Sequence, residues 1–203
     1  LYLPLAAQHT QWMPKASYRN QSDGGEYGDF VQMVDDEVGR FLQTLENAGV
    51  SENTIVIFTS DNGPYWTPEF IDRFDHQAAA HFRGMKGDAW DGGHRVPFMV
   101  RWPQKIESGS KTNQLTTLTN LMATVAEITK IELGENDGVD SRSILPVLLG
   151  GDPLNDIPVI HHSSRGVFAV RKGEWKYIEG LGSGGFSQPA FIEPEEGGPE
   201  GHV

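Results

Sequence analysis

The feature that most constrains the fold is a short apolar, β-branched run, Thr54 to Ser60, that ends in Asp61-Asn-Gly-Pro64. Strands buried on both faces of a sheet have continuous Val, Ile and Phe runs, so this segment is expected to be such a strand. In open α/β sheets, ligands bind beyond the carboxyl ends of the strands, and hard divalent cations prefer carboxylate and amide oxygens. Asp61 and Asn62 are therefore candidate metal ligands, although Asp-Asn-Gly is also ordinary turn chemistry.

An amphipathic helix is expected just before this strand. Apolar residues recur at three- and four-residue spacing over residues 29–47, and Gly49 is a natural residue to end the helix. Asp35 and Asp36 alternate with the apolar stripe, so we interpret them as a solvated helix face rather than as metal ligands. A helix followed by a strand suits a parallel sheet, and the fold class is α/β.

The rest of the chain predicts further short elements. We expect a buried strand at 1–7, a loop with one helical turn at 65–80, and a strand at 97–102. Helices are expected at 121–130, with Asn120 as N-cap, and at 144–149. Three short antiparallel strands are expected near 159–162, 167–171 and 175–178. The tail from Gly180, rich in Gly, Pro and Glu, is expected to be loop or disorder.

Composition excludes some functions and leaves others open. The formal charge of −12 argues against a nucleic-acid binder, because such a protein needs a basic face for phosphates. No run approaches 18 apolar residues, so no transmembrane span is expected. The absence of Cys excludes disulfides and thiolate metal sites. The sequence does not indicate an oligomeric state.

A second motif, Arg83-Gly-Met-Lys-Gly-Asp-Ala-Trp-Asp-Gly-Gly-His-Arg-Val-Pro97, runs into the strand expected at 97–102. Together with Asp61-Asn-Gly it resembles the sulfatase family of the alkaline-phosphatase superfamily. Family members carry a strand ending in Ser/Thr-Asp-Asn-Gly, followed by Gly-x-Lys-x-x-x-(Trp/Tyr)-(Glu/Asp)-Gly-Gly-x-Arg-Val-Pro. The similarity extends to Leu1–Thr10, which has Gln8 where Pro is more usual, to Asp137–Pro146 and to Phe168–Tyr177.

The resemblance implies an α/β fold made of the C-terminal part of an alkaline-phosphatase-like mixed sheet flanked by helices, with a small antiparallel α+β subdomain after it. We place the boundary at 150–156, so that residues 1–150 belong to the catalytic domain and 151–203 begin the subdomain. The family also implies a periplasmic or secreted enzyme.

The resemblance also assigns roles to residues. Lys86 and His9 would be catalytic and contact the sulfate group, and His9 would protonate the leaving oxygen. Asp61 and Asn62 would hold Ca²⁺ or Mg²⁺. Candidate substrate-binding residues are His76, His81 and His94, although His94 could equally face solvent. Asp91 and Arg95 are expected to form an ion pair that supports the loop. The substrate would be a sulfate monoester of a carbohydrate or an aryl alcohol.

The family nucleophile is a formylglycine made from Cys or Ser in a Cys/Ser-x-Pro/Ala-x-Arg motif, and this sequence contains no such motif. The paired aspartates of the family's first strand are also missing. We therefore expect the chain to be a fragment of a longer enzyme that is inactive by itself. Two alternatives remain: a phosphodiesterase or phosphonate hydrolase of the same superfamily, and an inactive or binding domain. The nucleophile sequence would distinguish the enzymes.

Overall fold

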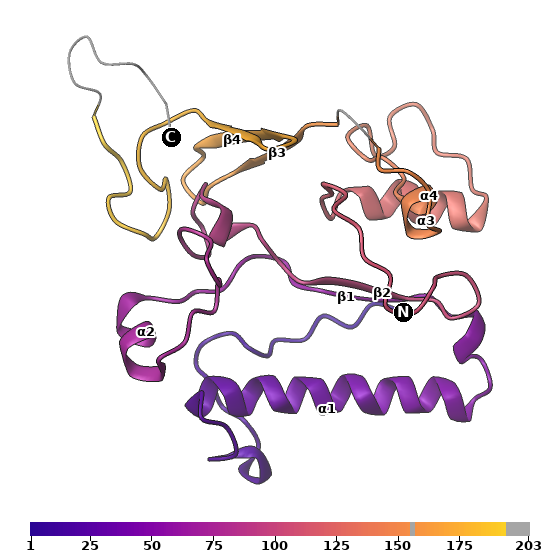
Figure 1. Ribbon diagram of the computed structural model, residues 1–203, viewed down its shortest axis with the longest axis horizontal. Coiled ribbons are helices and arrows are strands. Elements are labelled where there is room, and N and C mark those ends of the chain that lie inside the picture. The colour runs from indigo at the N-terminus through magenta and orange to yellow at the C-terminus, as the bar shows by residue number, and fades with distance from the viewer. Residues whose placement is uncertain (155–156, 194–203) are drawn as a thin grey trace.

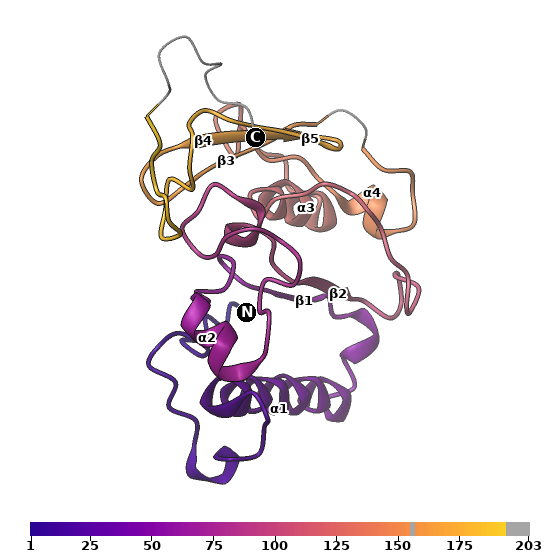
Figure 2. The same ribbon diagram turned by 60° about the vertical axis from the view of Figure 1, so that its left-hand side comes forward.

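The computed structural model describes residues 1–154 and 157–193. A long helix α1 forms one layer, a two-stranded ribbon β1–β2 lies in the middle, and a three-stranded sheet with helices α3 and α4 lies on the other side (Figures 1 and 2). The helices are α1 (Gly25–Asn47), α2 (Pro68–Phe74), α3 (Asn120–Thr129) and α4 (Leu145–Leu148). The strands are β1 (Val56–Thr59), β2 (Phe98–Arg101), β3 (Val159–His162), β4 (Phe168–Lys172) and β5 (Trp175–Ile178). Single turns of 3-10 helix occupy Ala16–Tyr18, Ser51–Asn53 and Asp91–Gly93.

Helix α1 confirms the amphipathic pattern. It buries Val34 and leaves Asp35 and Asp36 exposed, as the spacing of apolar residues predicts, and it also buries Asp29, which that spacing does not predict. The helix ends where Gly49 takes a φ of +70°, a conformation that Gly adopts without steric cost. The Gly49 and Val50 amides then donate to carbonyls of the last turn, at 2.9 and 3.1 Å.

The ribbon β1–β2 is antiparallel. We expected the strand at residues 54–60 to belong to a parallel sheet, and among the described strands this prediction is wrong, because β1 pairs only with β2. The reason is the long loop after β1, which returns the chain beside β1 in the opposite direction. In the observed register, Thr59 at the end of β1 faces Phe98 at the start of β2. The segments that follow β1 and precede β2 therefore meet at one end of the ribbon.

The sheet β3–β4–β5 is antiparallel, as predicted, and one of its faces covers the loop that precedes β2. Ala169 and Ile178 on that face pack with Ala89 and Trp90 of the loop, and all four are buried. This small core joins residues about 80 positions apart in sequence. The second half of the chain thus helps to shape the loop that carries Lys86.

Three local expectations differ from the structure. Residues 1–7 form no strand and are largely exposed, because no described strand pairs with them; Leu1 is 102% exposed. Asn120 lies inside α3 rather than capping it, since its side-chain oxygen accepts the Arg142 amide at 3.1 Å. The tail is a loop, as expected, but residues 182–185 are buried rather than disordered. Residues 194–203 of the tail lie outside the described residues.

The boundary proposed at 150–156 includes residues outside the described ranges, and the division into two domains stays a prediction. Within residues 1–154 and 157–193, no helix is both long enough and apolar enough to cross a membrane.

Candidate active site

The two sequence motifs lie against each other at one end of the ribbon. The Gly63 amide donates to the Gly93 carbonyl at 2.9 Å, and the Lys86 amide donates to the Pro64 carbonyl at 2.7 Å. A Cβ atom on Gly63 would lie 1.9 Å from the Gly92 carbonyl oxygen, so only glycine permits this approach. The loop with Asp61 and Asn62 and the loop with Lys86 are therefore held together through their backbones.

Asp61 and Asn62 follow β1 directly, as the sequence predicts. Asp61 is exposed and Asn62 is half-buried. The Asn62 side-chain nitrogen donates to the Gly63 carbonyl at 3.0 Å, which leaves the amide oxygen as the atom that can face a cation. Among the described residues, no group of three or more His, Asp or Glu could hold a metal ion. Since Ca²⁺ takes six to eight oxygen ligands, Asp61 and Asn62 could supply only part of a site.

Lys86 lies in a tight turn that is braced from several sides. The Asp88 amide donates to the Met85 carbonyl at 3.1 Å and closes the turn, in which Gly87 takes a φ of +86°. That conformation is the one that glycine provides at the third position of a type II turn. The Gly87 carbonyl also accepts the Ser164 amide at 2.7 Å.

Asp91 joins the motif loop to β4 and β5. Its carboxylate accepts Lys176 Nζ at 2.7 Å and Arg171 at 2.9 Å, and the expected Arg95 ion pair is present at 3.5 Å. Burial alone would raise the pKa of the Asp91 carboxyl. The hydrogen bond and charge of Lys176, with the charges of Arg171 and Arg95, outweigh burial and hold the pKa below its usual value.

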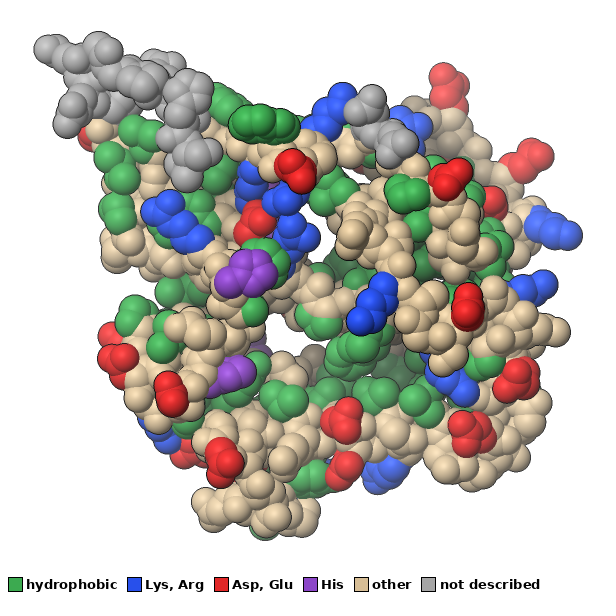
Figure 3. All heavy atoms as spheres, in the orientation of Figure 1, with side chains coloured by type: hydrophobic (Ala, Val, Ile, Leu, Met, Phe, Trp, Pro, Cys, Tyr) green, Lys and Arg blue, Asp and Glu red, His purple; other side chains and the backbone are tan. Residues whose placement is uncertain are grey.

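Sequence reasoning missed Arg171 and Lys176, although a signal was available. These two cations face each other across β4 and β5. Like charges directly opposite on neighbouring strands are destabilising unless an acid neutralises them, and Asp91 is that acid. Figure 3 shows Lys and Arg side chains gathered beside β3–β4, on a molecule whose acidic side chains are otherwise spread widely over the visible face.

His94 faces the small sheet rather than open solvent. Its ring lies 3.8 Å, centroid to centroid, from the ring of His161 on β3. His94 Nε2 and His161 Nδ1 are buried without a hydrogen-bond partner in the described part of the chain. Burial lowers the pKa of both rings, and that of His161 falls to about 3. Both rings are therefore neutral near pH 7, and a substrate contact for His94 stays a prediction.

The other three candidate histidines are exposed. His9 contacts the neighbouring Thr10 carbonyl through Nδ1 at 2.6 Å. His76 accepts Trp66 Nε1 on its carbonyl at 2.8 Å, and its ring lies edge-on to Trp66. His81 lies against Phe82, with ring centroids 4.2 Å apart. None of these contacts joins a histidine to Lys86 or Asp61, so their roles stay predictions.

Aromatic packing brings the N-terminal segment near the loop after β1. Trp12 packs on Trp66 and Phe70, with ring centroids 5.9 and 4.8 Å apart. Trp66 and Trp90 are buried and serve as packing residues. This packing holds the chain just after His9 on the side of α2, but it does not fix the His9 ring.

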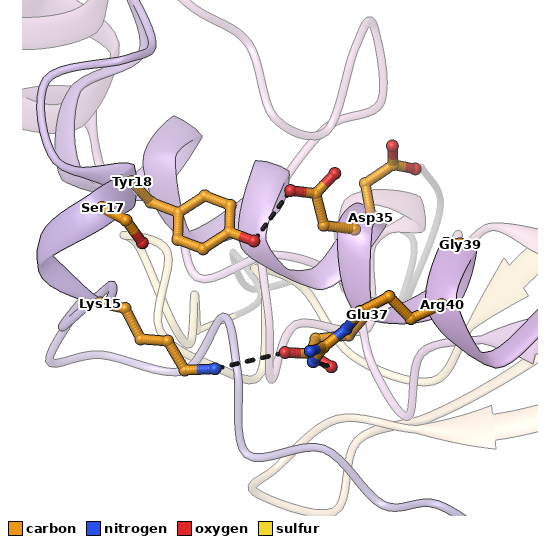
Figure 4. Close-up of a pocket in the computed structure, with 8 residues that line it drawn as sticks. Lys15, Ser17, Tyr18, Asp35, Glu37, Gly39 and Arg40 are labelled. Carbon is orange, nitrogen blue, oxygen red and sulfur yellow. Dashed lines mark hydrogen bonds and ion pairs between the residues drawn. The ribbon is translucent and has the colours of Figure 1, made fainter.

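A surface depression of about 490 Å³ lies elsewhere, between Ala16–Tyr18 and α1 (Figure 4). Tyr18 donates to Asp36 at 2.8 Å across it, and Lys15 pairs with Glu37 at 3.4 Å. Its lining contains none of the motif residues, so it is separate from the candidate active site.

Comparison with known proteins identifies the class. The sulfatase family profile matches residues 1–131. An N-acetylgalactosamine-6-O-sulfatase from Bacteroides thetaiotaomicron is 33% identical over 88% of this chain and 36% of its own length. An arylsulfatase from Hemicentrotus pulcherrimus is 34% identical over 87% of this chain and 31% of its own length. The chain belongs to the sulfatase family.

Solved structures agree with this assignment. A sulfatase structure from work on glycosaminoglycan metabolism by Bacteroides thetaiotaomicron superposes with a TM-score of 0.80 at 32% identity, covering 85% of this chain and 37% of that one. A sulfatase from Pseudoalteromonas sp. gives a TM-score of 0.69 at 28% identity, over 85% of this chain and 34% of that one. The chain has the mixed α/β fold of the C-terminal part of these enzymes. It spans about a third of the length of the curated relatives cited above.

Proposed function

We propose that this chain forms part of a sulfuric ester hydrolase and supplies the lysine, acid and amide of its active site. The observation that carries the proposal is the pair of backbone hydrogen bonds that holds the Asp61–Asn62 loop against the Lys86 loop. Two motifs separated by about 20 residues thus share one end of the ribbon, where the family likeness expects a sulfate group to bind.

In sulfate ester cleavage, negative charge builds on the sulfuryl oxygens and on the leaving alkoxide. A fixed positive charge and a proton donor stabilise that transition state. Lys86 supplies the charge from its braced turn, as a compact ammonium group. His9 protonates the leaving oxygen, and its ring is exposed on the N-terminal segment.

Asp61 and Asn62 fit a hard cation by the chemistry of their oxygens, and the family is consistent with metal-dependent catalysis. Ca²⁺ or Mg²⁺ bound there would neutralise the charge of the sulfuryl oxygens. The remaining ligands and the formylglycine nucleophile would come from outside this chain. The chain's own contribution is to present one carboxylate and one amide oxygen next to Lys86.

The substrate class that we propose is a sulfated carbohydrate. The relative from Bacteroides thetaiotaomicron acts, by its name, on 6-sulfated N-acetylgalactosamine, and the arylsulfatase relative is equally similar to this chain. Sequence identity to these two relatives therefore does not distinguish a sugar substrate from an aryl substrate. The structure from work on glycosaminoglycan metabolism has a TM-score of 0.80, above that of the Pseudoalteromonas sulfatase, and this likeness favours a sugar.

The test is sulfate release by the full-length protein from an aryl sulfate and from 6-sulfated N-acetylgalactosamine, with an aryl phosphonate and a phosphodiester as controls. We expect kcat/KM for a sulfate ester to exceed that for either phosphorus ester, and chelation of divalent ions to abolish turnover. Faster cleavage of the phosphonate or the phosphodiester would overturn the proposal. The isolated 203-residue chain should show no multiple turnover.

A further inference from the structure

Asp88 is a buried carboxylate within the motif loop that the chemistry above does not use. It is 0% exposed. One oxygen accepts the Met85 amide at 2.9 Å, and the other accepts the Phe186 and Ser187 amides at 2.8 and 3.0 Å. Burial of a carboxylate is costly unless hydrogen bonds compensate, and these charge-assisted bonds do so. The carboxylate therefore ties the Lys86 turn to a segment almost 100 residues away.

The segment from Ser183 to Ser187 lies directly on the backbone around Lys86. The Ala89 amide donates to the Ser183 carbonyl at 2.7 Å. A Cβ atom on Gly185 would lie 2.2 Å from the Gly87 carbonyl oxygen and 2.5 Å from the Asp88 carboxylate. Because the contact is this close, a shift of the 183–187 segment must move the turn.

Lys86 occupies the second position of the four-residue turn that Asp88 closes. Its amide is fixed on one side by the Pro64 carbonyl, and Asp88 fixes the turn on the other side. The Lys86 side chain starts at its Cα atom, so the position of the turn sets the region that its ammonium group can reach. A displacement of about 1 Å at a catalytic group can lower the rate about 100-fold.

We propose that Asp88 is a positioning residue that sets the place of Lys86, and that the 183–187 segment acts on the sulfate-binding site through it. This inference rests on the proposed role of Lys86. It adds to the active site a loop in the small C-terminal sheet region, which no sequence motif marks.

The chain offers a matched control for a purely structural role. Asp29 on α1 is 2% exposed, and its carboxylate also accepts three backbone amides, those of Asn20, Gln21 and Ser22, at 2.8–2.9 Å. Asp29→Asn and Asp88→Asn thus remove similar numbers of bonds from similarly buried carboxylates. Asp29 anchors the 20–22 loop and not the Lys86 turn.

The experiment measures sulfate-ester kinetics and thermal melting of the full-length protein with Asp88→Asn, Asp29→Asn, Lys86→Ala and the double variant Asp88→Asn/Lys86→Ala. We expect Asp88→Asn to lower kcat/KM by about 10- to 100-fold, chiefly through kcat, because it displaces the lysine. Asp29→Asn should lower the melting temperature by a similar amount with nearly normal kinetics. In the Lys86→Ala background, Asp88→Asn should cause little further loss, because it acts through Lys86.

A wild-type measurement covers the case in which Asp88→Asn does not fold. Hydrogen exchange of the full-length protein is compared with and without inorganic sulfate. Sulfate at Lys86 should slow exchange of the Phe186 and Ser187 amides several-fold and leave those of Asn20 to Ser22 unchanged. Unchanged exchange at 186–187, near-normal kcat/KM in folded Asp88→Asn, or full additivity with Lys86→Ala would each overturn the inference. Normal activity in Lys86→Ala would instead overturn the proposed role of Lys86.

Discussion

The loop at residues 83–97 and the segment at residues 1–13 were both expected to deliver a catalytic side chain, yet the structure treats them differently. In the loop, Met85, Ala89 and Trp90 are buried. In the N-terminal segment, Leu1, Leu3 and Leu5 are 102%, 54% and 54% exposed. The loop is braced by residues far away in sequence, whereas the hydrogen bonds of the His9 segment are to its near neighbours.

The difference lies in what each segment needs to become ordered. A Gly-rich loop can satisfy its polar groups through carboxylates and carbonyls that lie nearby, as Asp88 and Asp91 show. A strand needs a neighbouring strand for every second amide and carbonyl. Groups within the described residues therefore place the backbone of Lys86, whereas no described strand pairs with the segment that carries His9.

The largest effect that would sharpen this contrast is expected for Lys86→Ala in the full-length protein. Loss of a preorganised charge aimed at a developing oxyanion typically lowers kcat/KM by about 10²- to 10³-fold. Stability should change by only about 0.5 kcal/mol, as is usual at a loop position. Lys86→Arg should restore activity only in part, because a planar guanidinium does not replace a compact ammonium at a tight site.

Steady-state kinetics and thermal melts of both Lys86 variants provide the measurement, with the exposed loop residue Lys111→Ala as the matched control. If Lys86→Ala kept near-normal kcat/KM, the bracing of its turn would have no catalytic meaning. The proposed contact of Lys86 with the sulfate group would then be wrong.

A second prediction concerns the ion pairs that join the Lys86 loop to β4 and β5. Asp91→Ala removes the acid that neutralises Lys176, Arg171 and Arg95, and leaves three cations together. We expect a loss of about 2 kcal/mol, below the value for a fully buried network because solvent reaches these side chains. Urea unfolding measures it, with Asp137→Asn as an exposed control. A loss under about 0.5 kcal/mol would mean that the loop does not depend on the sheet.

The sequence predicted features whose signal lies within one segment, and it did not predict contacts between segments that are far apart in the chain. Helical spacing of apolar residues predicted α1, and short apolar runs predicted β1, β2 and the three strands of the small sheet, because each signal lies within the element. The family motif singled out Lys86, Asp61 and Asn62, and the structure brings their two loops together, while their roles in catalysis and metal binding stay predictions. The sequence did not indicate that Arg171 and Lys176 pair with Asp91 or that residues 186–187 bind Asp88. The two facing cations of the β4–β5 hairpin signalled that an acid must lie near them, but which acid does so, and what Asp88 binds, depends on how distant segments fold together.

A third prediction concerns the interface between the loop and β3. The pKa of His161 is about 3 and that of His94 is lowered, chiefly by burial, so the folded state holds both rings neutral. The unfolded chain binds protons on them near pH 6.5, so stability is complete above that pH and falls as the pH drops toward 3. Lys176, His162 and Asp91 also act on His161, and of these only Asp91 opposes the loss.

Melting temperatures of wild type and His161→Phe between pH 7.5 and pH 4.5 test this. Wild type should lose about 1 kcal/mol of stability by pH 5 at this contact, after allowance for solvent at the rings. His161→Phe should show a shallower dependence over the same range. An unchanged pH slope in the variant would show that the ring pair does not control the acid sensitivity.

The smallest effect is expected in the N-terminal segment. Leu5 is 54% exposed, so Leu5→Ser in the 203-residue chain should change stability by less than about 0.5 kcal/mol. The matched buried position is Val147 on α4, which is 6% exposed; Val147→Ser should cost about 2 kcal/mol or more, because it puts a hydroxyl into a packed site. Urea unfolding of both variants gives the comparison. A loss above about 1 kcal/mol for Leu5→Ser would mean that residues 1–7 are packed against the chain after all, and His9 would then be as firmly placed as Lys86.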